Sequence, residues 1–260
     1  GGVAMNSASL DQLASLDFIK NIYIPPSPGD SGSSIGAAYY SYLKSNIDKD
    51  IFLSKPSLFP SKFNSNKQRK LASKIIDSNY KIIAEDIKDI IEKSADLISE
   101  GQIIGVIIGN SETGPRALGN RSLICDGTNK DAVNFLNTKI KKRSPFRPTA
   151  PVMQESIAKK YYVVRDELIE CYKTMSATAK CKVGSESLNF PTTHIDKTAR
   201  IQIIEKDHLL YKLLDELQKY NIDILANSSL NLSGDPTSFD LIDAFMISSR
   251  SPLKYIITDF

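Results

Sequence analysis

The sequence has few of the residues that build metal centres, disulfide frameworks and membrane spans. Its 260 residues include three cysteines, an odd number without a CxxC pair, and two histidines, His194 and His208, fourteen positions apart. These numbers and spacings fit neither a disulfide framework nor a zinc site, so we interpret both histidines as structural or surface residues. The absence of any run of eighteen apolar residues excludes a membrane-spanning helix.

Signals for secretion are also missing from the sequence. The chain opens with GGVAMN, which has neither an initiator methionine nor the charged segment of a signal peptide. We therefore expect a cytoplasmic protein, and we interpret this apolar, glycine-rich opening as the interior of a larger domain that starts upstream. A net charge of +3 and an isoelectric point near 8.6 are too mild to indicate a nucleic-acid partner.

Helical and strand patterns alternate along the chain, which indicates an α/β protein. The apolar residues 102–109, QIIGVIIG, predict a buried strand, and residues 222–226 predict another. Residues 207–220 form the clearest amphipathic helical pattern, with Asp207 as its N-cap. The polar, proline-containing segment 45–70 predicts a linker between two domains.

Positive charge is concentrated in residues 110–151. Against three acidic residues, the basic ones are Arg116, Arg121, Lys130, Lys139, Lys141, Lys142, Arg143 and Arg147. Because glycine and proline fix the backbone direction around several of them, we expect their side chains to be aimed into a cleft. Aimed guanidinium groups suit phosphate, since the planar fork donates two parallel hydrogen bonds. The segment therefore predicts an anion-binding site; the alternative is a solvated basic surface.

Two further segments carry polar groups at places where ligands bind. The loop 227–236, NSSLNLSGDP, follows the predicted strand 222–226 and offers neutral donors and acceptors. Alone it reads as an ordinary turn cluster, but together with the basic segment it predicts a shared cleft at strand ends. Near the N-terminus, Asp30 follows a Pro-Gly turn and is either a helix N-cap or a ligand for a metal or phosphate.

Several of these segments resemble the C-terminal part of the NodU/CmcH-type O-carbamoyltransferases. The resemblance rests on GPRALGNRS at Gly114–Ser122 and NTKIKKRSPFRPTAP at Asn137–Pro151. It continues, in the family's order, with GGVAMN, PSPGDSGSSIGAA, THIDKTARIQ and NSSLNLSGDP. It covers nearly the whole chain, and the length of the central motif makes it specific.

The resemblance implies a YrdC-like α/β domain with an open twisted sheet in residues 59–260. Residues 1–58 would be the last piece of an actin-like ATPase-type domain with its linker. In such enzymes the YrdC-like domain joins ATP, which carries Mg²⁺, and carbamoyl phosphate into carbamoyl-adenylate. The carbamoyl group then passes to a hydroxyl group of a small-molecule acceptor in the actin-like part, which holds a divalent metal of the iron or zinc type.

The resemblance also implies roles for individual residues. Arg116, Lys141 and Arg147 match catalytic positions. The residues matched to binding of carbamoyl phosphate and ATP are Arg116, Arg121, Lys141, Arg143, Arg147, Arg200, Asn227 and Ser228. Asp30 matches one ligand of the metal in the actin-like part. Asn110 stands where the family commonly has an arginine, so this chain lacks one positive charge near the site.

Two other functions stay open at this point. YrdC-like domains can present a concave basic surface, so an RNA-binding module is the first alternative, although only Phe135 and Phe146 interleave with the cations. A binding or scaffold domain without activity is the second. We expect small-molecule partners and no membrane, with nucleic acid disfavoured; a homodimer and the identity of the acceptor stay open.

Overall fold

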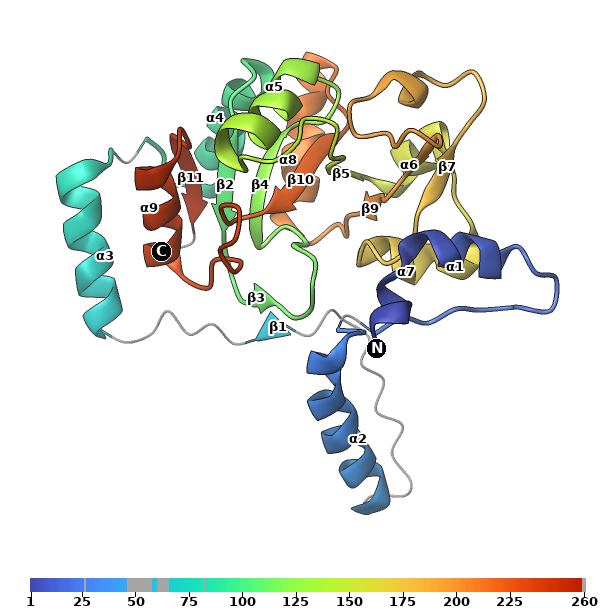
Figure 1. Ribbon diagram of the computed structural model, residues 1–260. Coiled ribbons are helices and arrows are strands. Elements are labelled where there is room, and N and C mark those ends of the chain that lie inside the picture. Colours follow the sequence, from blue (N-terminus) through green and yellow to red (C-terminus); the bar gives the residue numbers. More distant parts are fainter. Residues whose placement is uncertain (26, 46–57, 60–65, 82, 259–260) are drawn as a thin grey trace.

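A mixed six-stranded sheet forms the centre of the computed structural model, which describes residues 1–25, 27–45, 58–59, 66–81 and 83–258 (Figure 1). In spatial order the strands are β11 (Tyr255–Thr258), β2 (Ile104–Ile107), β4 (Arg121–Asp126), β10 (Leu225–Ser229), β5 (Ala150–Met153) and β9 (Gln202–Ile203). The outer pairs β11–β2 and β5–β9 are parallel, and the inner pairs are antiparallel. The predicted α/β class is confirmed.

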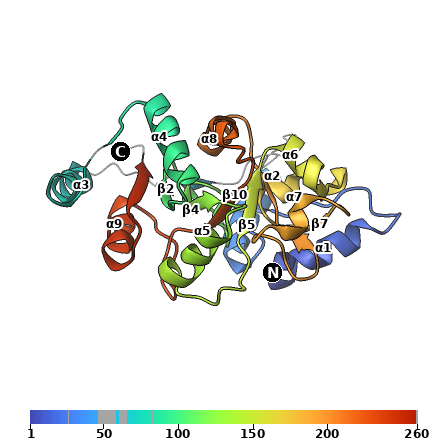
Figure 2. The ribbon, with the colours of Figure 1, turned by 90° about the horizontal axis from the view of Figure 1, so that it is seen from above.

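Helices cover both faces of this sheet (Figure 2). On one face lie α4 (Ile87–Ser99) and α8 (Leu209–Leu217), and on the other lie α5 (Lys130–Phe135) and α9 (Leu241–Arg250). Successive strand side chains point to opposite faces, so Leu123 and Ile124 of β4 belong to two different cores. Both faces are buried, which explains why β2 lies in a continuous apolar run.

Helix α8 confirms the amphipathic pattern predicted over residues 207–220, but its cap is different. The N-cap is His208, whose Nδ1 accepts the backbone N–H of Leu210 at 3.0 Å. The helix begins one residue later than expected, which leaves Asp207 outside the cap position. His208 is half-buried in this position, and desolvation lowers the pKa of its imidazole.

A smaller lobe adjoins the main sheet. Its elements are α6 (Glu155–Tyr161), β6 (Tyr162–Val163), α7 (Ile169–Lys173), β7 (Ala179–Cys181) and β8 (Thr198–Ala199), and the three strands pair in the order β6-β7-β8. Helix α1 (Ser7–Ala14) packs into the core of this lobe through Leu10 and Ala14. An ion pair of 3.1 Å between Arg165 and Asp11 adds a polar contact. The N-terminal segment is therefore part of the packed body.

Helix α2 (Ser33–Ser45) projects away from this body and has no buried residue (Figure 1). A 3₁₀ turn at Asp30–Gly32 precedes it, and α3 (Asn66–Asn79) lies beside α9. The short strand β1 (Leu58–Phe59) pairs with β3 (Ser111–Glu112). Most of the predicted linker 45–70 lies outside the described residues, so the division at residue 58 stays a prediction.

Apolar helices of membrane-spanning length do not occur in the described ranges.

Candidate functional site

Strand directions bring four separate segments to one edge of the sheet. Strand β10 is antiparallel to β4 and β5, with Ser229 opposite Ser122 and Asn227 opposite Ala150. The end of β10 therefore lies beside the starts of β4 and β5. Strand β9 is parallel to β5 and begins just after Arg200, so this residue reaches the same edge.

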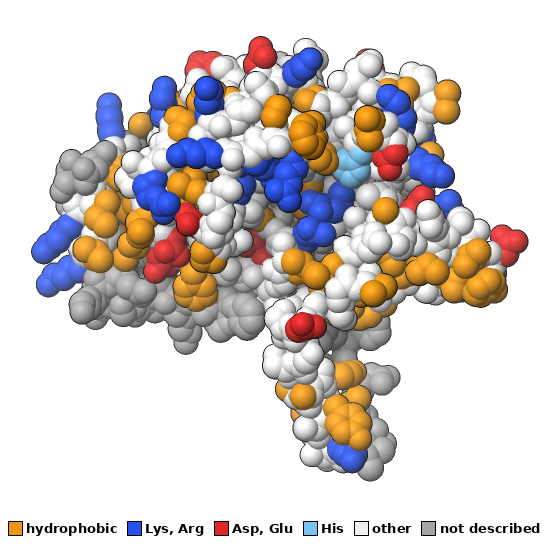
Figure 3. Space-filling view, viewed as in Figure 1, with side chains coloured by type: hydrophobic (Ala, Val, Ile, Leu, Met, Phe, Trp, Pro, Cys, Tyr) orange, Lys and Arg blue, Asp and Glu red, His pale blue; other side chains and the backbone are white. Residues whose placement is uncertain are grey.

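A cavity of about 310 Å³ lies where these segments meet. The polar and charged residues on its walls are Ser7, Arg116, Arg143, Arg147, Thr149, His194, Arg200, Asn227, Ser228 and Ser229. The cleft that the sequence predicts between the basic segment 110–151 and the loop 227–236 is thus present. Lys and Arg side chains gather at the centre of this face in Figure 3, with a histidine beside them.

Positive charge on the cavity walls is not neutralised by neighbouring carboxylates. Among the residues described, no Asp or Glu lines the cavity, and none of Arg116, Arg143, Arg147 and Arg200 forms an ion pair. Burial lowers the pKa of Arg116, and burial together with Arg147 lowers that of Arg143. Burial, Arg116 and Arg143 lower the pKa of Arg200 to about 10. Like charges held this close favour the entry of an anion.

Buried polar atoms without a hydrogen-bond partner occur at the same walls. They are Nη2 of Arg143, Nε of Arg200, Oγ1 of Thr149 and Oδ1 of Asn227. Folded proteins pair nearly all such atoms, and each unpaired one costs about 1–3 kcal/mol. Four of them around one cavity are groups that a ligand or an ordered water can complete.

The loop that carries Arg116 is shaped by one carboxylate. Oε1 of Glu112 accepts the backbone N–H groups of Leu118 at 2.7 Å, Asn120 at 2.8 Å and Arg121 at 3.1 Å. The segment between is held as a closed loop that presents Arg116 to the cavity. Glu112 is not singled out from the sequence, because its role depends on hydrogen bonds between residues six to nine positions apart.

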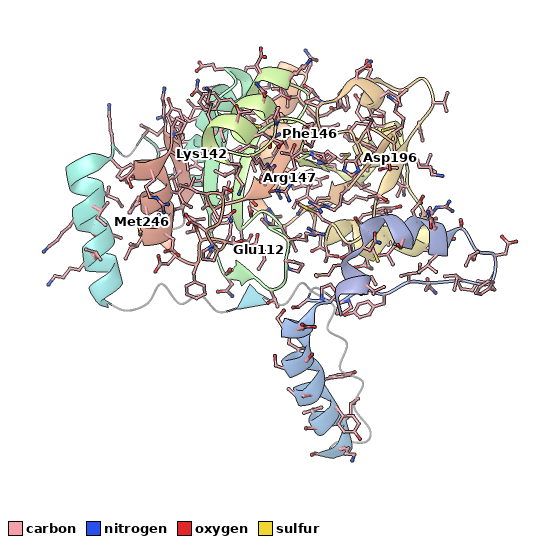
Figure 4. All side chains as sticks on the ribbon, in the orientation of Figure 1. Glu112, Lys142, Phe146, Arg147, Asp196 and Met246 are labelled. Carbon is pink, nitrogen blue, oxygen red and sulfur yellow. The ribbon has the colours of Figure 1, made fainter. Side chains whose placement is uncertain are left out.

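A single buried amide, Asn137, holds the loop that carries Arg143 and Arg147. Oδ1 of Asn137 accepts from Nε of Arg143 at 2.7 Å, and its Nδ2 donates to the carbonyl oxygen of Arg147 at 2.9 Å. Asn137 lies in a short π-helix (Leu136–Ile140) that continues α5. Figure 4 shows Arg147 and Phe146 near the centre of the face. Sequence reasoning missed Asn137 too, although it opens the motif NTKIKKRSPFRPTAP.

Arg121, which sequence reasoning placed in the phosphate grip, does not line the cavity. Its side chain is only 1% exposed, and its guanidinium group donates to the carbonyl oxygens of Ile108 at 2.7 Å, Gly109 at 3.0 Å and Phe239 at 3.0 Å. Its position at the start of the central strand β4 places it inside the body. Arg121 ties the end of β2 to the segment before α9.

Lys141 also lies behind the cavity wall rather than on it. Its ammonium group donates to the backbone oxygens of Ser229 and Asn231, each at 2.8 Å, and so holds the turn after β10. Burial lowers the pKa of Lys141 to about 7, and the charges of Arg143 and Arg147 contribute. Its contact with a substrate stays a prediction, because Lys141 is not among the lining residues although it holds Ser229, which is.

His194 lines the cavity, a position that the interpretation of the histidines as structural or surface residues did not specify. Its Nδ1 lies 3.0 Å from Oγ1 of Thr198. Burial lowers the pKa of His194, an effect that Asp196 opposes and Arg200 reinforces. The available signal was its place six residues before Arg200 in the motif THIDKTAR.

Asp30 is exposed and is the first residue of the 3₁₀ turn before α2. Gly29 occupies the N-cap position of that turn, so the N-cap reading of Asp30 is wrong. The described residues include no group of three or more His, Cys, Asp or Glu that could hold a metal ion. The metal site at Asp30 stays a prediction, because no further ligands for it are found among the described residues.

Relatives of the chain are longer than the chain itself. It is 30% identical over 283 residues to an uncharacterized protein of Synechocystis sp., covering 100% of this chain and 46% of that protein. It is 29% identical over 254 residues to nodulation protein NolNO of Sinorhizobium fredii, covering 94% of this chain and 36% of that protein. The chain thus spans less than half the length of these relatives.

Solved structures are similar at TM-scores below 0.5. Full-length HypF in a phosphate- and nucleotide-bound form gives 0.49 at 19% identity, over 71% of this chain and 27% of that one. Sua5 of P. abyssi in complex with L-threonine gives 0.47 at 13% identity, over 68% and 48%.

Sequence comparison assigns the family. The model of the carbamoyltransferase C-terminus matches residues 95–259, which is more than half of the chain. The match includes the cavity residues from Arg116 to Ser229. This chain therefore belongs to the carbamoyltransferase C-terminus family.

Proposed function

We propose that the cavity binds carbamoyl phosphate and the phosphate groups of ATP, and that the chain forms carbamoyl-adenylate from them. The observation that carries this proposal is the set of four arginines without carboxylate partners, within residues matched by the carbamoyltransferase C-terminus model. Two polyanions repel each other, so bringing them together requires concentrated positive charge held in place before they bind. Phosphoryl-group chemistry needs such positioning more than a protein nucleophile.

The size of the cavity suggests how the two substrates share it. A volume of about 310 Å³ is at the small end for ligand pockets, which suits small anionic groups better than a whole nucleotide. The adenosine part of ATP would then lie outside, near the loop on which Phe146 is 87% exposed. Mg²⁺ would enter bound to the ATP phosphates, as it commonly does, because no carboxylate lines the described walls.

The balanced reaction consumes ATP, carbamoyl phosphate and one water, and it releases pyrophosphate and phosphate. Transfer of the carbamoyl group to an acceptor hydroxyl is a separate step. By resemblance that step involves a divalent metal, of the iron or zinc type, for which Asp30 would supply one ligand. Because no metal-binding group is found among the described residues, we propose that this chain alone forms the adenylate and does not complete the transfer.

Pyrophosphate release tests this function. The chain is incubated with ATP, carbamoyl phosphate and Mg²⁺, and the adenylate is sought by mass spectrometry. We expect pyrophosphate only when both substrates are present, and none from Arg143→Met. A folded chain that binds neither substrate would overturn the proposal. Tight RNA binding with a steep dependence on salt would favour the RNA-binding alternative instead.

A further inference from the structure

The cavity walls differ in chemistry. The cations come from loops, namely the loop before β4, the loop before β5 and the segment before β9. Of the neutral groups, Asn227 and Ser228 belong to β10, and Thr149 is the residue before the neighbouring strand β5. A ligand that fills the cavity therefore meets guanidinium groups on one part of its surface and neutral hydrogen-bonding groups on another.

Asn227 is held in one orientation by its neighbours. Its Nδ2 donates to the carbonyl oxygen of Ala117 at 3.0 Å and to Oε1 of Gln202 at 2.9 Å. Gln202 is fixed in turn, because its Nε2 donates to the carbonyl oxygen of Leu118 at 2.7 Å. A flipped amide would place the oxygen of Asn227 against two other oxygens. Both donor hydrogens of Asn227 are therefore used inside the protein.

The remaining polar atom of Asn227, Oδ1, has no hydrogen-bond partner, and the side chain is only 3% exposed at the cavity wall. Oδ1 is an acceptor, so a ligand completes it only with an N–H or O–H donor. The ionised oxygens of a phosphate ester offer none. A ligand that meets both the arginines and Oδ1 of Asn227 therefore combines an anionic part with a neutral donor.

We propose that Asn227 determines specificity by accepting a hydrogen bond from the amide nitrogen of carbamoyl phosphate. This inference rests on the proposed function and adds to it the group that distinguishes the substrate from other acyl phosphates. Acetyl phosphate has the same charge and nearly the same shape, but it has a methyl group where carbamoyl phosphate has its amino group. With acetyl phosphate bound, Oδ1 of Asn227 stays buried and unpaired, which is the kind of mismatch that enzymes discriminate most strongly. Gln202 acts as a positioning residue, because it orients the amide of Asn227.

Calorimetric titration of the unmodified chain with the two acyl phosphates is the first part of the test. We expect carbamoyl phosphate to bind roughly tenfold more tightly than acetyl phosphate, the value of one buried hydrogen bond. Equal affinities would overturn the inference and leave the arginine site standing. Absence of binding of both ligands to a folded chain would overturn the proposed function as well.

Two variants of Asn227 test whether this residue causes the preference for carbamoyl phosphate over acetyl phosphate. In Asn227→Leu, and in Asn227→Thr, which suits a strand better, we expect the preference to fall to about onefold while acetyl phosphate still binds. Arg147→Ala is the matched control, because it should weaken both ligands equally and keep the ratio. An unchanged ratio in a folded Asn227 variant would overturn the assignment. If neither variant folds, equal affinities in the unmodified chain would still overturn it.

Discussion

Basic residues of one sequence segment serve two different regions of the molecule. Arg143 and Arg147 face the cavity, and neither forms an ion pair within the described residues. Arg121 and Lys141 are buried and donate to backbone carbonyl oxygens. The guanidinium groups of the first pair keep N–H donors that a ligand can accept. The N–H donors of the second pair are used in hydrogen bonds within the protein. Donor satisfaction, rather than charge, thus separates the cations that we propose to bind a ligand from the structural ones.

The largest expected effect is a loss of stability when a buried cation, Arg121, is replaced. Arg121→Met leaves the carbonyl oxygens of Ile108, Gly109 and Phe239 without their donor. Hydrogen bonds to charged groups contribute about 1.5–3 kcal/mol each, so we expect the free energy of unfolding to fall by roughly 3 kcal/mol or more. Urea denaturation measures this change. The control, Arg147→Met, should stay within about 0.5 kcal/mol of the unmodified chain; equal stability of both variants would remove the distinction between the sets.

The next largest effect is a loss of affinity for carbamoyl phosphate when an arginine of the cavity wall is replaced. Arg147→Ala and Arg200→Met should each weaken carbamoyl phosphate binding ten- to hundredfold, since a charge-assisted contact contributes about 1.5–3 kcal/mol. Their melting temperatures should be unchanged or higher, because like charges around the cavity repel one another. Calorimetric titration and thermal unfolding measure the two quantities. Normal affinity in a variant would show that its arginine is not part of the site.

A smaller loss of affinity is expected at Asn137, a buried residue that holds two cavity arginines in place. Asn137→Ala removes the amide that orients Arg143 and the loop of Arg147. We expect about tenfold weaker binding of carbamoyl phosphate, while the affinity is restored in part by Asn137→Gln, which keeps both hydrogen-bonding groups. Asn134→Ala, on the exposed side of the same helix, is the control. A loss of stability without a loss of affinity would make Asn137 purely structural.

The smallest effect is a change of protonation on binding. The pKa of Lys141 is lowered to about 7 and that of His194 is also lowered, so at pH 8 both groups are mainly neutral. An anion in the cavity raises both pKa values, and binding should take up a fraction of a proton. By linkage, the affinity for carbamoyl phosphate should fall as the pH rises through 7 to 9. Titrations in buffers of different ionisation enthalpy measure the uptake; identical heats would contradict it.

Much of this organisation could be predicted from the sequence. The buried strand predicted in QIIGVIIG is present as β2, and the cleft expected between the basic segment and residues 227–236 contains Arg143, Arg147 and Asn227. The strand predicted at residues 222–226 is displaced, because β10 spans Leu225–Ser229 and so contains Asn227 and Ser228, which were expected in the loop after it. The roles of Arg116 and Arg121 could not be separated, because both stand two residues after a glycine within the motif GPRALGNRS. What separates them is strand register, since Arg121 begins the central strand β4 while Arg116 stays in the loop before it.

Residues that hold others in place were the hardest to predict. Glu112 and Asn137 act through hydrogen bonds to the backbone of loops, and such bonds depend on the folded geometry rather than on residue type. The partners of Asn227 come from two distant segments, at Ala117 and Gln202. Neither the periodicity nor the composition of the sequence predicts these contacts.

A crystal structure of the chain with carbamoyl phosphate tests the central claim most directly. We predict the phosphate group within hydrogen-bonding distance of the guanidinium groups of Arg143 and Arg200, and the carbamoyl nitrogen next to Oδ1 of Asn227. Arg121 should keep its contacts with the carbonyl oxygens of Ile108 and Gly109. Carbamoyl phosphate bound elsewhere on the chain, or absent from this cavity at saturating concentration, would contradict the account.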